Sequence, residues 1–187
     1  MKRYSLNLFV AAAVLFFSFS AVSAKGVEIH KSGKGIIKDY QKNLKEAQKK
    51  LLSLAEEIPE KDYSWRPAEG VRSISEALVH TAVGNLFIPK FLGFKYSEKF
   101  SSSLEKEMTK KADVIALLKK SFKFDNECFS KVNENHLGVE VDFFNKQKAT
   151  KRYVLLLIIA HNHEHLGQMI AYARSVGVVP PWSQKKK

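Results

Sequence analysis

The chain of 187 residues contains a single cysteine, Cys128, and only five prolines and nine glycines to interrupt helices. One cysteine excludes an intrachain disulfide, so a hydrophobic core or a bound metal must stabilise the fold. Cys128 lies in the segment DNECFSKV, which has helical character. We interpret it as a small buried residue, the usual place of a free cysteine.

The sequence also lacks the motifs that would name a reaction. It has no phosphate-binding loop, no nucleophilic serine motif, no nucleic-acid-binding motif and no internal repeat. The formal charge is +12. However, lysines alternate with acidic and apolar residues, as in KEAQKK and KEMTKK, which is typical of solvated helix faces. We therefore predict no nucleic-acid partner. A basic envelope module that binds anionic polymers is an alternative.

The first 24 residues, MKRYSLNLFVAAAVLFFSFSAVSA, have the layout of a secretory signal peptide. Lys2 and Arg3 precede an uncharged apolar stretch, and the small residues VSA follow it. The stretch is shorter than the roughly 20 residues that span a bilayer. We predict cleavage after Ala24, export to the periplasm or beyond, and no stable membrane insertion afterwards. An uncleaved anchor is the alternative.

Two segments with helical periodicity make up the first half of the mature chain. Apolar residues recur every three or four positions through residues 36–58, and Pro59 ends this helix. Ser73 and Glu76 form the pattern of a capping box, so a second helix begins there. Pro89 would bend or end it.

Two further helices are predicted in the second half. The third begins at Asp113, a possible cap, after a polar loop with a short helix, and the fourth runs from the cap Thr150 to Gly177. The segment between them is irregular, with a short extended piece at most. These elements predict an all-α fold, a four-helix bundle in an up-down arrangement with long connections, over residues 36–183. Residues 25–35 form a flexible N-terminal segment and residues 184–187 a basic tail.

The segment HNHEHLGQ in the fourth helix contains candidate metal ligands. His161 and His165 are four residues apart and continue the apolar face of this helix, so both can reach one metal ion, whereas His163 points away. His80 borders the core from the second helix. If the three imidazoles converge, a divalent ion bound by all three would give each buried ring nitrogen a partner. Core histidines with ordinary hydrogen bonds are the alternative.

Three polar residues lie near the predicted ligands, and two of them have two interpretations each. Gln168 follows His165 by almost one helical turn and would either hydrogen-bond a ligand or pack between helices. Glu164 would be a general base or a solvated glutamate. Asn85, off the face of His80, is interpreted as structural.

Two blocks resemble the DinB/YfiT-like family: YSWRPAEGVRSISEALVHTAVGN and HNHEHLGQMIAYARSVGVVPPWS. The resemblance implies a four-helix bundle, frequently a homodimer, with a divalent metal on His80, His161 and His165. Nickel, zinc and manganese are all plausible for the family. Some of its members transfer low-molecular-weight thiols onto electrophiles in the cytoplasm.

The combined prediction is an exported metal-dependent hydrolase or thiol-dependent transferase that acts on an unknown small-molecule substrate. The signal peptide departs from the cytoplasmic relatives, since such thiols are abundant in the cytoplasm. Metal-activated hydrolysis therefore stays open. The alternative is a non-catalytic metal-binding or structural protein of the envelope.

Overall fold

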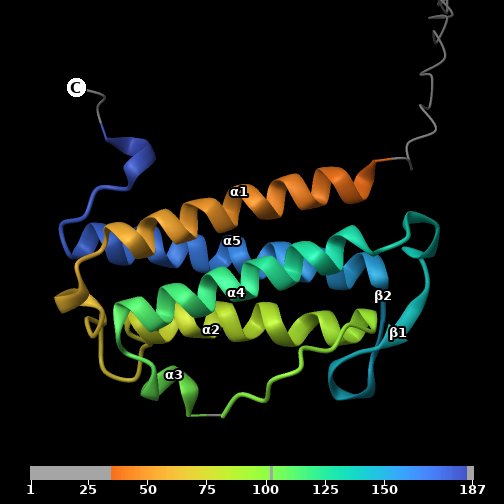
Figure 1. Cartoon of the computed structure of the whole chain (residues 1–187), viewed down its shortest axis with the longest axis horizontal. Helices are drawn as coiled ribbons and strands as arrows, with labels where there is room; N and C mark the ends of the chain where they lie inside the picture. The colour runs from red at the N-terminus through yellow and green to blue at the C-terminus, as the bar shows by residue number, and fades with distance from the viewer. Residues whose placement is uncertain (1–34, 102, 185–187) are drawn as a thin grey trace, which may run out of the picture. The chain divides into compact units, whose positions relative to one another are not determined.

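A computed structural model describes residues 35–101 and 103–184 (Figure 1). The predicted signal peptide, most of residues 25–35 and most of the basic tail lie outside the described residues. The described part is an all-α four-helix bundle, as the sequence periodicity predicts. Its long helices are α1 (Ile36–Glu57), α2 (Ile74–Phe87), α4 (Lys111–Ser130) and α5 (Lys151–Ser175), and its short helix is α3 (Leu104–Glu107).

Each long helix has two neighbours in the bundle. Helix α1 packs against α4 and α5, and α2 packs against the same two helices. Helices α2 and α4 run in the same direction (Figure 1), whereas the sequence predicted an up-down arrangement with long connections. The connection from residue 88 to residue 110, which includes α3, explains this difference, because it is long enough to carry the chain back along the bundle.

Several predicted helix ends are present. The Ser73 side chain accepts a hydrogen bond from the backbone of Glu76, whose carboxylate accepts one from the backbone of Ser73. Thr150 caps α5 with its side chain. Helix α2 ends two residues before Pro89, and a 3-10 turn follows. These caps fix where α2 and α5 begin and therefore which residues face each other between them.

Two local predictions differ from the structure. Helix α4 begins at Lys111, so Asp113 lies in its first turn rather than at its cap, where its charge still suits the helix dipole. The segment before α5 contains two paired strands instead of one extended piece. Strands β1 (Glu140–Asp142) and β2 (Lys148–Thr150) form an antiparallel hairpin. Strands this short leave almost no alternation pattern in the sequence.

The core lies between the four helices. Burying each large apolar side chain contributes about 1.5–3 kcal/mol relative to leaving it exposed. Cys128 is buried as predicted, and burial raises the pKa of its thiol to about 12, so the thiol is unreactive near neutral pH. The fully buried leucine, isoleucine, phenylalanine and methionine residues include Leu44, Leu51, Leu54, Leu78, Leu118, Phe129, Leu155, Ile158 and Met169.

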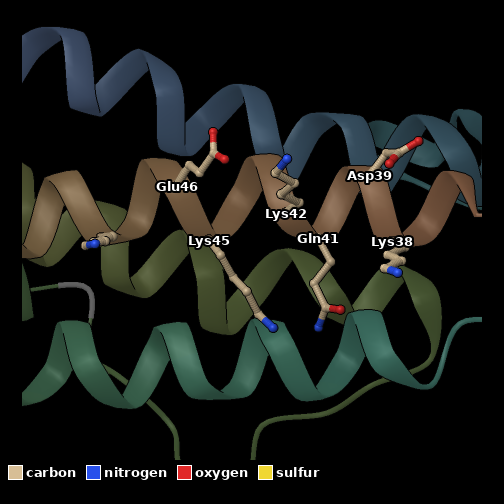
Figure 2. Close-up of a pocket in the computed structure, with 7 residues that line it drawn as sticks. Lys38, Asp39, Gln41, Lys42, Lys45 and Glu46 are labelled. Atoms are coloured by element: carbon tan, nitrogen blue, oxygen red, sulfur yellow. The ribbon is translucent and has the colours of Figure 1, made fainter.

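The outer face of α1 carries lysines together with acidic residues. Figure 2 shows Lys42 and Lys45 interleaved with Asp39 and Glu46 along this helix. All four side chains are exposed. The alternation of signs fits the interpretation of the lysines as a solvated helix face. Among the described helices, none has the length and apolar character to cross a membrane.

Candidate metal centre

The structure brings the three predicted histidines together between α2 and α5. His80 lies on α2, and His161 and His165 lie one turn apart on α5. The ring centroids are 5.4 Å apart for His80 and His161, 5.0 Å for His80 and His165, and 4.5 Å for the two rings on α5. One ring nitrogen from each histidine lies within 4.8 Å of the other two, so the three can share one metal ion.

Two other polar residues of the motif, His163 and Glu164, lie outside this cluster. His163 is exposed, as predicted, and its Nε2 atom lies 2.8 Å from Oδ1 of Asn43 on α1. Glu164 is exposed as well. Solvation therefore accounts for Glu164 without a role as a base.

The two predicted ligands on α5, His161 and His165, are neutral at physiological pH. Burial, together with the neighbouring His165 and His80, lowers the pKa of His161 to about 3. Burial also lowers the pKa of His165. A neutral imidazole offers a nitrogen lone pair to a metal, whereas a protonated one repels it.

His161 also has an unsatisfied atom. Its Nδ1 is buried and has no hydrogen-bond partner within the described part of the chain. Leaving a buried polar atom unpaired costs about 1–3 kcal/mol. A metal ion bound to this Nδ1 and to the other two rings would offset this cost, so the residues present fit such an ion.

Two side chains hold the remaining rings through their Nδ1 atoms. Oε1 of Glu105 lies 2.7 Å from Nδ1 of His80, and Oε1 of Gln168 lies 2.8 Å from Nδ1 of His165. Both oxygens can only accept, so each ring carries its proton on Nδ1 and leaves Nε2 free for a metal. Nε2 of Gln168 donates to the hydroxyl of Tyr172 at 3.0 Å. Of its two interpretations, Gln168 therefore fits the contact with a predicted ligand.

Glu105 lies on α3, and sequence reasoning missed it. Its second carboxylate oxygen accepts from Nε of Arg72 at 2.7 Å, which gives a continuous chain from Arg72 through Glu105 to His80. Burial raises the pKa of Glu105, but the hydrogen bonds from Arg72 and His80 outweigh it and lower the pKa overall. The surrounding sequence, SSSLEKEMTKK, is mostly polar, and its two apolar residues are too few to establish a helical periodicity that would mark this glutamate.

Gly84 makes room for His161. A Cβ atom at this position would lie 2.3 Å from Cε1 of His161 and 2.9 Å and 3.0 Å from its ring nitrogens. Only glycine permits this close approach of α2 to the ring. A signal did exist in the sequence, because Gly84 is a helical glycine four residues after His80 and shares its face.

A pair of amides sets the alignment of α2 and α5. Asn85 donates to Oδ1 of Asn162 at 3.3 Å, and Asn162 donates back to Oδ1 of Asn85 at 2.7 Å. Both residues are fully buried. Asn85 is therefore structural, as interpreted from the sequence. The reciprocal bonds hold the two helices in the register that places His80 opposite His161 and His165.

Comparison with known proteins identifies the family to which the chain belongs. Among solved structures, it is similar to a DinB-like protein from Bacillus cereus (TM-score 0.68, 18% identity, 78% of this chain and 95% of that one). It is also similar to a DinB-like protein from Bacillus subtilis (TM-score 0.62, 23% identity, 80% and 99%). A conserved protein from Enterococcus faecalis has a TM-score of 0.61 at 15% identity, covering 74% and 95%. No curated protein matches the chain. The sequence profile of the DinB family matches residues 31–186, and the chain therefore belongs to the DinB family.

Proposed function

We propose that the chain binds one divalent metal ion through His80, His161 and His165 and uses it in a reaction on a small molecule. The observation that carries this proposal is the convergence of three imidazole nitrogens within 4.8 Å on two packed helices. Nickel, zinc and manganese remain candidates, since imidazole ligands alone do not select one of them.

Three protein ligands support a reactive site rather than a purely structural one. They leave coordination positions for water or substrate, whereas structural zinc sites are usually closed by four protein ligands. When bound, a divalent ion would lower the pKa of water or of a thiol and supply a nucleophile at neutral pH. We therefore propose a metal-dependent hydrolase or a thiol-dependent transferase. Glu105 and Gln168 would keep the protons of His80 and His165 on Nδ1.

Export is part of the proposal and rests on the N-terminal sequence. A protein outside the cytoplasm meets fewer low-molecular-weight thiols, which favours water as the nucleophile. The second candidate is a non-catalytic protein that uses the same metal for stability or storage. The pocket next to Glu105 and Gln168, described below, favours the enzyme.

Metal analysis of untagged protein tests the site. We expect about one divalent ion per chain in the parent and its loss in His80→Ala and His161→Ala, because two imidazoles hold a metal poorly. His163→Ala is the matched control and should keep its metal, since its ring contacts Asn43 instead. An N-terminus at Lys25 in protein from the native host checks export in the same sample.

A parent that takes up no nickel, zinc or manganese on dialysis would contradict the metal site. A parent that binds metal but shows neither hydrolysis nor thiol transfer across broad substrate panels, with and without thiols, would favour the non-catalytic candidate.

A further inference from the structure

A pocket of about 770 Å³ lies next to the side chains that hydrogen-bond His80 and His165. Two of the residues that line it, Glu105 and Gln168, hydrogen-bond His80 and His165. One wall of the pocket therefore consists of the groups that hold the predicted ligands. Its volume is in the range of about 300–1,000 Å³ that small-molecule sites occupy. The charged residues that line it are Arg66, Arg72, Glu76, Glu105 and Lys106.

Both carboxylates of the pocket are already engaged. Glu76 accepts from Arg66 at 2.9 Å and from the backbone nitrogen of Ser73 at 2.8 Å. Burial raises its pKa, but these two hydrogen bonds lower it overall. Glu105 is held by Arg72 and His80 in the same way. Each carboxylate is thus ionised and compensated by its own arginine.

The cations keep unused donors. Arg72 donates to Glu105 through Nε alone, and within residues 35–101 and 103–184 neither of its Nη atoms has a side-chain or backbone partner. Its side chain is 44% exposed. Lys106 forms no salt bridge within the same ranges. The pocket therefore presents the Nη edge of Arg72, which keeps free N–H donors although Glu105 balances its charge, and the ammonium group of Lys106, which no carboxylate of the described residues neutralises.

We infer that this pocket binds the oxyanion group, a carboxylate or a phosphate, of a small-molecule substrate, with Arg72 and Lys106 as its recognition groups. Guanidinium groups match the geometry of both oxyanions through paired N–H donors. A divalent ion on the histidines would add positive charge at the pocket wall. The link to a reaction rests on the proposed function, whereas anion binding is a property of the pocket alone.

Titration with inorganic phosphate tests the inference. Phosphate is added to the mature full-length chain, both zinc-loaded and metal-free, at low ionic strength, while NMR follows the side-chain signals of Arg72 and Gln168. We expect saturable binding in both forms. Two substitutions should each weaken phosphate binding by about three- to tenfold: Arg72→Lys, which keeps the positive charge but loses the paired N–H donors of the guanidinium group, and Lys106→Met.

Lys110→Met is the matched control. It removes the same charge from the same connection, but Lys110 does not line the pocket, so binding should change by less than about twofold. Equal losses in Lys106→Met and Lys110→Met would overturn the inference, because general attraction would then explain binding. Phosphate that binds only the zinc-loaded form would overturn it too. Metal analysis of the same samples reports separately on the proposed function, which stands or fails without the pocket.

Discussion

Two buried polar regions of the bundle differ in a way that separates a candidate site from a structural one. The first lies between α2 and α5 and contains the three histidines. The second lies between α1 and α4 and contains Gln48, Asp125 and Asn126. Both regions include buried atoms without a hydrogen-bond partner in the described part of the chain: Nδ1 of His161 in the first, and Oδ1 of Asp125 and of Asn126 in the second.

The two regions differ in the groups that surround Nδ1 of His161 and Oδ1 of Asp125. Around His161 stand the imidazole rings of His80 and His165 and a helical glycine, Gly84, that makes space for its ring. Around Asp125 stand amides: Gln48 donates to its Oδ2 at 3.2 Å, and Asn126 donates to Gln48 at 2.8 Å. Burial raises the pKa of Asp125 well above its usual range, so the carboxyl can hold a proton. An unpaired buried atom therefore indicates a metal site only when several donors converge on it.

Among the variants that test this difference between the two regions, Gly84→Ala should have the largest effect. The added methyl group would overlap the ring of His161, which must move out of the cluster. We expect metal affinity to fall by more than about 100-fold and the free energy of unfolding to fall by about 1–3 kcal/mol, the usual cost of overpacking. Metal titration and urea denaturation measure the two effects.

Gly167→Ala is the matched control on α5. Gly167 is exposed, and a Cβ atom there would meet nothing within 4 Å. Alanine favours helix over glycine, so this variant should keep its metal and gain about 0.5–1 kcal/mol of stability. If Gly84→Ala behaved like Gly167→Ala, the close packing of α2 against His161 would be excluded.

Glu105→Ala should have a smaller effect on the same site. Without the carboxylate, His80 loses the group that fixes its tautomer and orientation. We expect metal affinity to fall by about 10–100-fold, as is typical when such outer contacts are removed. Competition with a chromogenic chelator measures this loss. The control is Glu107→Ala on the same short helix, whose carboxylate contacts Ser103 instead. Equal affinities in the two variants would rule out the role of Glu105.

The sequence predicted the features that depend on one segment of the chain, and it missed those that depend on contacts between distant segments. Helical periodicity, the caps at Ser73 and Thr150, and the spacing of His161 and His165 are properties of one segment, and all appear in the structure as predicted. The contact of Glu105 with His80 joins residues 25 positions apart through an irregular connection, so no spacing rule could reveal it. The parallel course of α2 and α4 depends on that same connection.

Asp125→Asn should have the smallest effect, and its sign follows from the raised pKa of Asp125. A carboxyl whose folded pKa is raised contributes its full stability below the ordinary pKa of about 4 and loses it as pH rises through the folded pKa. Asparagine has a similar shape and stays neutral. Metal-free Asp125→Asn should therefore match the parent near pH 4 and exceed it at pH 8 by about 1 kcal/mol or more. Urea denaturation across this range measures the difference.

The control is Asp113→Asn, at an exposed position in the first turn of α4. This variant should instead lose about 0.3–1 kcal/mol of stability at pH 8, because it gives up a favourable charge near the helix N-terminus. A less stable Asp125→Asn at pH 8 would mean that Gln48 stabilises an ionised carboxylate, and the region between α1 and α4 would then hold a buried charge after all.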